Sequence, residues 1–188
     1  MKRVLSVAFV LSVCLSLISV AQNPPQAPKP GPELKSLNYL LGTWTETGET
    51  KAGPMGPGGK FTGTDKIDWM PGGFFLVSHM SGSSPEGKWT GVAIYGYDNE
   101  KKAYTYDEFN SMGEAVHATG HLDGKVWTWT SDLTMGGKTT KTRFILTEES
   151  PVAYTMKFEM SPDGNNWSTV MEGTGKKAGA TKAAAKKK

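Results

Sequence analysis

Three histidines are the side chains of this sequence best suited to metal or haem ligation: His79, His117 and His121. His117 and His121 are four residues apart, so on a β-strand they would share a face at a separation of about 13 Å. Neighbouring metal ligands on one strand are better placed two residues apart, and we therefore expect no metal site. One of these histidines could ligate a haem iron. A histidine at the surface or in a hydrogen bond is the simpler interpretation, so the sequence predicts no cofactor.

The acidic side chains include two adjacent pairs, Asp107–Glu108 and Glu148–Glu149. Adjacent residues of a strand point to opposite faces, so neither pair can act as a facing acid and base without partners from other segments. We interpret both pairs as structural or solvating. The sequence contains no Gly-x-Ser-x-Gly motif, no Walker loop, no His-Glu-x-x-His motif and no calcium loop. We therefore predict no catalytic residue.

Aromatic side chains are the best candidates for a binding function. A Tyr or Trp ring combines a large apolar surface with one polar group that can orient a mostly apolar ligand. The same rings are also typical of an ordinary barrel core, and strand alternation alone cannot separate a packed interior from a cavity. The candidate cavity-lining residues are Trp69, Tyr95, Tyr97, Tyr104, Tyr106, Phe109, Trp127 and Trp129.

The elements that must position these rings are long strands. Turn signals built from Gly, Pro and Asp-Gly recur every 12 to 14 residues between positions 71 and 163. From Val152 to Met160 every second residue is apolar, which is typical of a half-buried strand. A meander of about ten such strands hides its edges by closing into a barrel. We predict an all-β fold, an antiparallel up-and-down β-barrel, with a short N-terminal helix over residues 33–41.

The N-terminal segment has the pattern of an export signal. Lys2 and Arg3 precede an apolar run that ends in Ser19-Val20-Ala21. A basic start, an apolar centre and small residues at the cleavage positions are typical of a secretory signal peptide. We expect cleavage after Ala21 and a secreted or periplasmic protein.

Composition divides the rest of the chain into a linker, a domain and a tail. Five prolines between positions 24 and 32 indicate an extended linker. The last 13 residues contain only Lys, Ala, Gly and Thr, which predicts a disordered tail. The expected division is a signal peptide at 1–21, a Pro-rich linker at 22–32, a barrel domain at 33–175 and a Lys/Ala-rich tail at 176–188.

The formal net charge of +3 comes from the two ends of the chain. Between residues 22 and 175 there are 13 Lys and Arg against 18 Asp and Glu. A mildly acidic domain is not expected to bind nucleic acid, and the basic tail favours at most a peripheral contact with an anionic envelope. Cys14 is the only cysteine and lies in the expected signal peptide. The mature chain then has no disulfide and no thiolate ligand.

Several sequence blocks carry a resemblance to a known family. Leu41-Gly42-Thr43-Trp44 follows the expected helix and is similar to the Gly-x-Trp entry to the first strand of lipocalin-like (calycin-type) barrels. The further blocks are Phe61-Thr62-Gly63-Thr64, 69–77 (WMPGGFFLV), 94–98 (IYGYD), 110–113 (NSMG) and 170–172 (VME). Over about residues 34–176 the chain resembles the bacterial secreted family known as domain of unknown function 1579. The resemblance implies a lipocalin-like barrel and no established chemistry.

The resemblance also implies structural roles for Gly42, Trp44 and Arg143. In lipocalins the first-strand Trp packs under a late-strand Arg, and Arg143 is the only arginine after Arg3. A Trp44–Arg143 stack is therefore expected as a structural lock. This chain departs from the family pattern at three positions, where Phe74, Asn110 and the Lys176-Lys177 pair replace an Arg, an Asp and an Arg.

The function that these features favour is binding of a small hydrophobic or amphipathic ligand in the barrel interior. Two alternatives stay open. One is a small-molecule enzyme that uses inward Tyr, His and acidic side chains. The other is a structural envelope protein that adheres through its basic tail.

Overall fold

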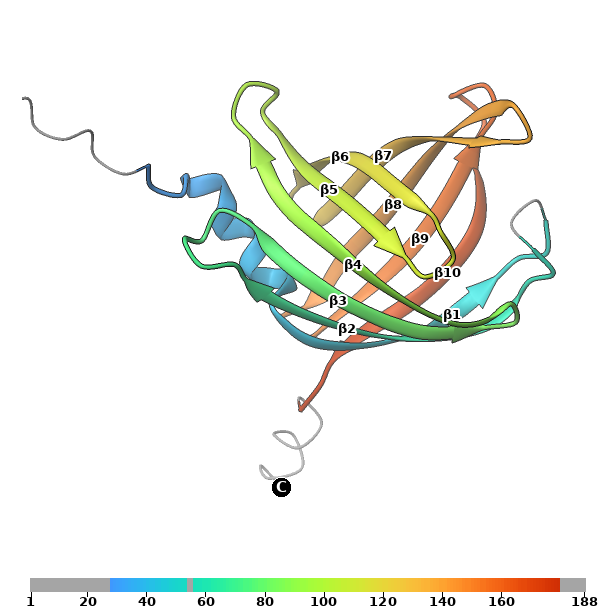
Figure 1. Ribbon diagram of the computed structural model, residues 1–188, viewed down its shortest axis with the longest axis horizontal. Coiled ribbons are helices and arrows are strands. Elements are labelled where there is room, and N and C mark those ends of the chain that lie inside the picture. The colour runs from blue at the N-terminus through green and yellow to red at the C-terminus, as the bar shows by residue number, and fades with distance from the viewer. Residues whose placement is uncertain (1–27, 54–55, 180–188) are drawn as a thin grey trace, which may run out of the picture.

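Ten strands and one short helix make up the part of the chain that the computed structural model describes, residues 28–53 and 56–179 (Figure 1). The helix is a 3-10 helix, η1 (Pro32–Leu40). The strands are β1 (Gly42–Thr50), β2 (Gly59–Trp69), β3 (Leu76–Ser84), β4 (Gly87–Asp98), β5 (Ala103–Asn110), β6 (Ala115–Asp123), β7 (Val126–Met135), β8 (Lys138–Ser150), β9 (Ala153–Ser161) and β10 (Ser168–Lys177).

The strands form one closed barrel in sequence order. Each strand pairs antiparallel with the next, and β1 closes the sheet by pairing with β10 from Trp44↔Lys177 to Thr50↔Met171. Closure leaves none of these ten strands with an unpaired edge. The prediction of an all-β, antiparallel up-and-down barrel is confirmed.

Alternation along each strand decides what faces the interior. In β2, the side chains of Phe61, Asp65 and Ile67 are buried, whereas Thr62 and Lys66 are exposed. Successive side chains of a strand point to opposite faces, so every second residue of β2 faces the interior. This series includes a carboxylate among the apolar residues.

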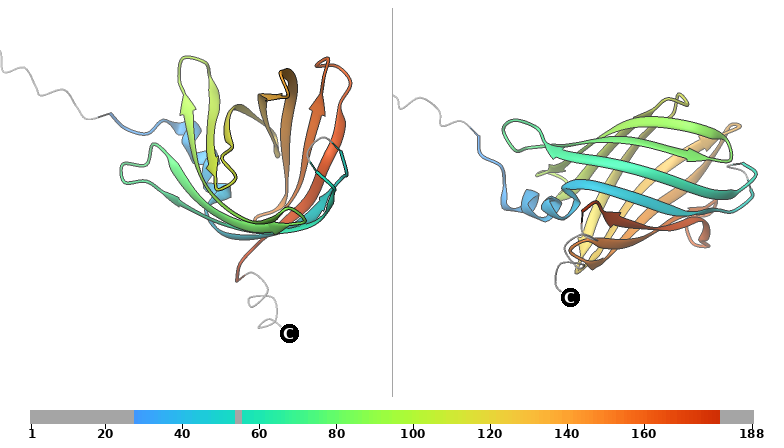
Figure 2. Two further views of the ribbon diagram at one scale, coloured as in Figure 1. Left: turned by 45° about the vertical axis from the view of Figure 1, so that its right-hand side comes forward. Right: turned by 90° about the horizontal axis from the view of Figure 1, so that it is seen from below.

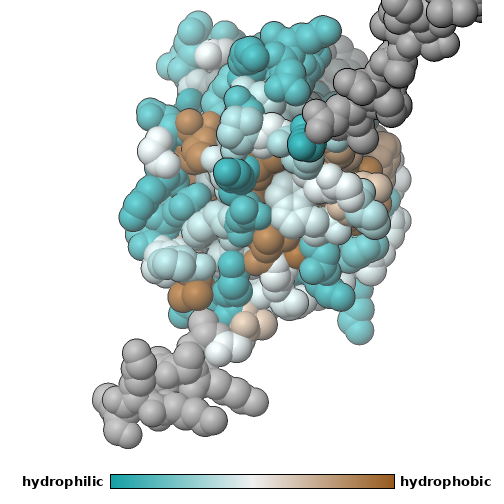
Figure 3. Space-filling view, turned by 90° about the vertical axis from the view of Figure 1, so that its left-hand side faces the viewer, coloured by the Kyte–Doolittle hydropathy of each residue, from teal (hydrophilic) through white to brown (hydrophobic). Residues whose placement is uncertain are grey.

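Helix η1 covers one end of the barrel, which we call the closed end (Figure 2). Leu34, Leu37 and Leu40 are spaced by three residues, and a 3-10 helix has three residues per turn, so all three lie on one buried face. The hydroxyl of Tyr104 donates to the carbonyl oxygen of Glu33 at 3.1 Å. The outer surface at this end is mostly hydrophilic, with small separate apolar areas (Figure 3). The β1–β2, β3–β4, β5–β6, β7–β8 and β9–β10 hairpins surround the opposite, open end.

A glycine joins η1 to the barrel. Gly42 has a φ of 106°, a backbone conformation that side chains other than glycine rarely adopt. The bend brings Trp44 under the helix, where its side chain is 1% exposed and its Nε1 donates to the carbonyl oxygen of Leu40 at 2.8 Å. Gly42 and Trp44 thus connect the helix to the barrel core.

One predicted boundary needs correction. Lys176 and Lys177, assigned to the tail by composition, are the last residues of β10 and pair with β1. The predicted signal peptide (1–21), most of the linker (22–27) and the end of the tail (180–188) lie outside the described residues.

Candidate ligand-binding site

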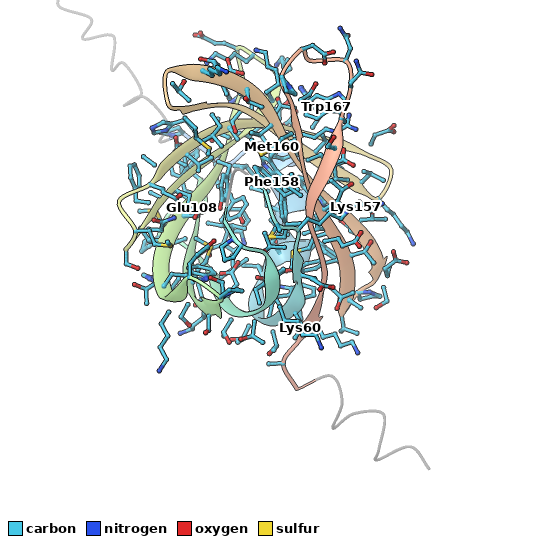
Figure 4. The ribbon with its side chains drawn as sticks, turned by 90° about the vertical axis from the view of Figure 1, so that its right-hand side faces the viewer. Lys60, Glu108, Lys157, Phe158, Met160 and Trp167 are labelled. Atoms are coloured by element: carbon cyan, nitrogen blue, oxygen red, sulfur yellow. The ribbon has the colours of Figure 1, made fainter. Side chains whose placement is uncertain are left out.

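A cavity of about 370 Å³ occupies the barrel interior. It extends from Leu40 of η1 to Glu86 and Met112 in the hairpins of the open end. Side chains from all ten strands line it. Figure 4 looks toward the open end, with Glu108 on one side of the interior and Phe158 on the other.

The interior stays open because large rings lie flat against inward-facing glycines of the neighbouring strand. A Cβ atom added to Gly120 would lie 2.5 Å from Nε1 of Trp129, and one added to Gly175 would lie 2.1 Å from Cζ of Tyr154. Both distances are shorter than any real contact, so only glycine permits these ring positions. The register pairs that show this packing are Gly48↔Phe61, Gly82↔Trp89, Gly120↔Trp129 and Gly175↔Tyr154.

Five carboxyl residues line the cavity: Glu86 and Glu114 lie in the hairpins of the open end, and the other three come from strands on one side of the interior. We call these three, Glu46 (β1), Asp65 (β2) and Glu108 (β5), the acidic wall. Strands β1 to β5 are consecutive neighbours, so the wall occupies one half of the barrel. Each carboxyl group accepts a hydrogen bond from a hydroxyl group. The donors are Tyr154 to Glu46, Ser78 to Asp65 and Tyr106 to Glu108.

Burial raises the pKa of every carboxyl group in the acidic wall. The pKa of Asp65 is raised to about 7, first by desolvation and then by the negative charges of Glu46 and Glu108, against the lowering effect of the Ser78 hydrogen bond. The pKa values of Glu46 and Glu108 shift in the same direction, chiefly through desolvation. Near neutral pH, Asp65 therefore exchanges between a neutral acid and a carboxylate.

The opposite half of the cavity is mainly apolar; its hydroxyl groups, on Ser131 and Thr142, hydrogen-bond to each other. Its side chains come from β6 to β9, and we call this set the apolar wall: Ala118, Trp129, Phe144, Leu146 and Met156. No Lys, Arg or His side chain lines the cavity in the described part of the chain. The cavity thus combines an apolar half with an acidic half that has no neutralising cation.

Three of the eight predicted lining residues meet in the cavity. Tyr95, Tyr106 and Trp129 all line it. The ring centroids of Tyr95 and Tyr106 are 4.9 Å apart, and those of Tyr95 and Trp129 are 6.0 Å apart. Burial raises the pKa of both tyrosines well above the ordinary value, so their hydroxyls remain protonated donors.

Four others pack toward the closed end. Tyr104 lies between Tyr97 and Trp127, with centroid distances of 5.1 and 4.9 Å. Trp127 stacks on Trp129 at 5.3 Å with an interplanar angle of 7°. Nε1 of Trp69 donates to Oδ1 of Asn38 in η1 at 3.0 Å. These rings form the packed floor of the cavity and not its lining.

Phe109 lies outside the barrel, so its predicted place in the cavity is wrong. Its side chain is 49% exposed, and its ring packs against the exposed His117 at 6.0 Å. Phe109 is an odd number of residues from Tyr104 and Tyr106, so strand alternation sends its side chain to the opposite face.

Arg143 does not stack on Trp44, so the expected lock has a different cation. The Arg143 guanidinium lies 4.1 Å from the ring centroid of Trp167, and its Nε donates to Glu159 at 2.6 Å. Nζ of Lys177 instead lies 4.6 Å from the ring centroid of Trp44. The partner comes from the last strand, whose family pattern ends in Arg where this chain has Lys.

Sequence reasoning missed the acidic wall, although a signal was present. Asp65 shares strand parity with Phe61 and Ile67, and Glu108 shares parity with Tyr106. A charged residue within an apolar parity series indicates an inward-facing polar group. The interpretation of the Asp107–Glu108 pair as structural or solvating needs correction for Glu108, because Glu108 lines the cavity.

The described residues contain no group of three or more His, Cys, Asp or Glu side chains placed to hold a metal ion. The acidic wall therefore does not form such a group. Also within this part of the chain, no helix is long and apolar enough to cross a membrane.

The closed ten-stranded barrel, its helix-covered end and its internal cavity define a lipocalin-like β-barrel. Residues 29–177 match the family described as protein of unknown function (DUF1579), and the chain belongs to that family. A search of curated proteins gave no match.

Two solved structures are similar to this chain. The crystal structure of Rv2717c from M. tuberculosis has 14% sequence identity and a TM-score of 0.53, and the match covers 79% of this chain and 99% of that one. The structure of EF1p2_mFAP2b bound to DFHBI has 13% identity and a TM-score of 0.39, over 77% of this chain and 98% of that one. The first similarity shows a shared fold.

Proposed function

We propose that this protein binds one small, mainly apolar molecule with a polar end inside the barrel. The observation that carries the proposal is the internal cavity of about 370 Å³. Small-molecule sites commonly measure roughly 300–1,000 Å³ and combine apolar walls with a few polar groups. The apolar wall and the acidic wall have that composition.

The arrangement of the rings supports binding rather than simple packing. Trp129 and Tyr154 leave the centre empty because Gly120 and Gly175 let them lie against the wall. Filling an apolar void with side-chain atoms ordinarily stabilises a protein, so an open interior is costly without a ligand.

The test is binding of the apolar fluorescent probe N-phenyl-1-naphthylamine. We expect enhanced fluorescence that saturates at one probe per chain. In the variant Ala118→Phe, a larger side chain on the inner face of β6 should fill the cavity and abolish the signal. Ala115→Phe is the matched control, because Ala115 is exposed on the outer face of the same strand.

Equal binding to wild-type protein and Ala118→Phe would contradict an interior site. Loss of binding in both variants would indicate damage to β6, and a thermal unfolding measurement on each variant separates this outcome from cavity filling.

We also propose that the protein is exported and cleaved after Ala21. The support is the basic start, the apolar run and the Ser19-Val20-Ala21 site of the sequence. N-terminal sequencing of the protein recovered from the periplasm or medium should begin at Gln22. A chain that begins at Met1 would overturn this proposal.

A further inference from the structure

The two walls of the cavity differ in chemistry, and this difference favours one class of small molecule. The inference drawn from it rests on the proposed function. The acidic wall offers three carboxyl groups, whereas the apolar wall offers methyl, thioether and aromatic surfaces and carries no ionisable group. None of the described lining residues is Lys, Arg or His. Carboxylates without a cationic partner are costly to bury.

We propose that the ligand is an organic amine, whose ammonium group pairs with Asp65 on the acidic wall while its apolar body lies against Trp129 and Phe144.

Asp65 is the carboxyl group best placed for this pairing. Its side chain is 8% exposed and lines the cavity. It accepts one hydrogen bond, from Ser78 to Oδ1, and no other described residue donates to it. The second oxygen is therefore free to accept from a ligand. A hydrogen bond between an ammonium group and a carboxylate is about twice as strong as one between neutral groups.

The surroundings of Asp65 favour a cation. Glu46 lies on the adjacent strand β1, one diagonal position away, because Trp44 pairs with Asp65 and Glu46 is two residues further on. The charges of Glu46 and Glu108 both act on the pKa of Asp65. Tyr95 and Tyr106 add ring faces to the same half of the cavity, and aromatic faces attract cations.

An organic cation fits better than a metal ion. The described residues place no three His, Cys, Asp or Glu side chains around one point. A divalent ion needs several ligands at about 2.0–2.6 Å. An ammonium group needs one or two acceptors, and its hydrocarbon body fills the space along the apolar wall.

Unpaired at the second oxygen, the carboxyl group of Asp65 has a pKa of about 7. An ammonium partner favours the carboxylate, so amine affinity should rise as pH increases through that range. The titratable groups facing Asp65 are Glu46, Tyr95, Tyr106, Glu108 and Tyr154. The three tyrosines stay neutral throughout, because burial raises their pKa values.

The experiment compares three probes with one ring and different end groups: 1-naphthylmethylamine, 1-naphthylmethanol and 1-naphthoate. Isothermal titration at pH 8 should give the amine an affinity about ten- to a hundredfold higher than the alcohol, as expected for a hydrogen bond to a charged group. The naphthoate should bind more weakly than the alcohol, because its charge repels the acidic wall. Between pH 5 and pH 8 the amine affinity should rise, whereas the alcohol affinity should not.

Two isosteric variants locate the end group, and one variant controls for the change of charge. Asp65→Asn and Glu108→Gln should each reduce amine affinity, Asp65→Asn by about tenfold or more, with little effect on the alcohol. Asp107→Asn removes a carboxylate from the outer face of β5, next to Glu108, and should leave all three affinities unchanged. Amides keep the shape of the carboxyl group, so the barrel should fold in each case.

The outcomes separate this inference from the proposed function. Equal binding of amine and alcohol, or preferred binding of naphthoate, would overturn the amine assignment while the interior site stands. An amine preference that survives in Asp65→Asn would place the ammonium group elsewhere and overturn the pairing. Failure of all three probes and of N-phenyl-1-naphthylamine would contradict the interior site, and the amine assignment with it.

Discussion

At the closed end of the barrel, Trp44 is almost fully buried and donates its indole N–H to the carbonyl oxygen of Leu40. Directly opposite Trp44 on the neighbouring strand β2, Asp65 is buried with a free carboxylate oxygen, beside a cavity of about 370 Å³. The two regions share the same strands. At the closed end, side chains fill the interior and their polar groups are hydrogen-bonded. In the cavity half, glycines leave the interior open and carboxyl groups line it.

This difference indicates that one end of the sheet mainly stabilises the fold, whereas the other end forms the binding site. Complete packing and satisfied hydrogen bonds give most of the stability of a core. Binding sites depart from those rules, because groups placed for a ligand are poorly satisfied without it. We therefore expect substitutions at the closed end to destabilise the fold. Replacing a buried carboxyl group of the cavity by the amide of the same shape should instead stabilise it.

The largest expected effect is at the closed end. Trp44→Ala should lower the free energy of unfolding by about 3–5 kcal/mol, because it leaves a cavity beneath η1. Phe144→Ala on the apolar wall should cost less, because the Phe144 side chain is only partly buried, whereas Trp44 is 1% exposed. Chemical denaturation of both variants measures the two costs. Equal costs would show that the cavity half is packed as tightly as the closed end.

The next effect has the opposite sign and depends on pH. The pKa of Asp65 is raised from 3.8 to about 7 in the fold, so its ionisation destabilises the folded protein as pH rises through that range. At pH 8 the cost is roughly 4 kcal/mol at most, and below pH 4 it vanishes. Asp65→Asn should therefore raise the unfolding free energy at pH 8 and leave it nearly unchanged at pH 4.

Thermal unfolding of Asp65→Asn at the two pH values checks this prediction. Asp107→Asn is again the control on the outer face. A stability gain of the same size at both pH values would contradict the assigned ionisation of Asp65.

The next prediction concerns one tyrosine hydroxyl in each region, that of Tyr154 in the cavity half and that of Tyr39 at the closed end. Tyr154→Phe removes the donor to Glu46 and should cost about 1–3 kcal/mol, with the larger cost at the higher pH, because an ionised carboxyl group depends on its donor more than a neutral one. Tyr39→Phe removes hydrogen bonds to the carbonyl oxygens of Ser150 and Ala153 and should cost about 1 kcal/mol. The pKa of Tyr39 is raised to about 12, so this cost should not vary between the two pH values. Chemical denaturation of both variants at pH 8 and pH 4 measures these costs.

The smallest expected effect concerns the cation over Trp44. Lys177→Met removes the contact of Nζ with the ring and its hydrogen bond to the carbonyl oxygen of Tyr39. The cost should be about 0.5–1 kcal/mol, reduced because burial already lowers the pKa of Lys177. Lys176→Met, on the outer face of β10, should change nothing measurable. A larger loss in Lys176→Met would show that strand pairing, not the ring contact, dominates here.

The architecture followed from the sequence because it depends on local signals. Turn residues at regular spacing and alternation such as that from Val152 to Met160 each act within a few residues, and together they determine strand number and order. The helix was also found, since Leu34, Leu37 and Leu40 form a short apolar series.

The site was harder to predict from the sequence, because it depends on which inward-facing side chains leave the cavity open. Tyr95 and Trp127 both face inward, yet only Tyr95 lines the cavity. The difference lies in their distance from η1, which no local pattern encodes. The choice of Lys177 over Arg143 as the partner of Trp44 is also nonlocal, because it depends on closure of β1 against β10.

The most direct test of the account is a crystal structure of the protein with 1-naphthylmethylamine. We expect the naphthyl ring in the cavity, against the faces of Trp129 and Phe144, and the nitrogen within hydrogen-bond distance of the free oxygen of Asp65. A ring bound outside the barrel, or an amino group directed through the open end into solvent, would contradict it.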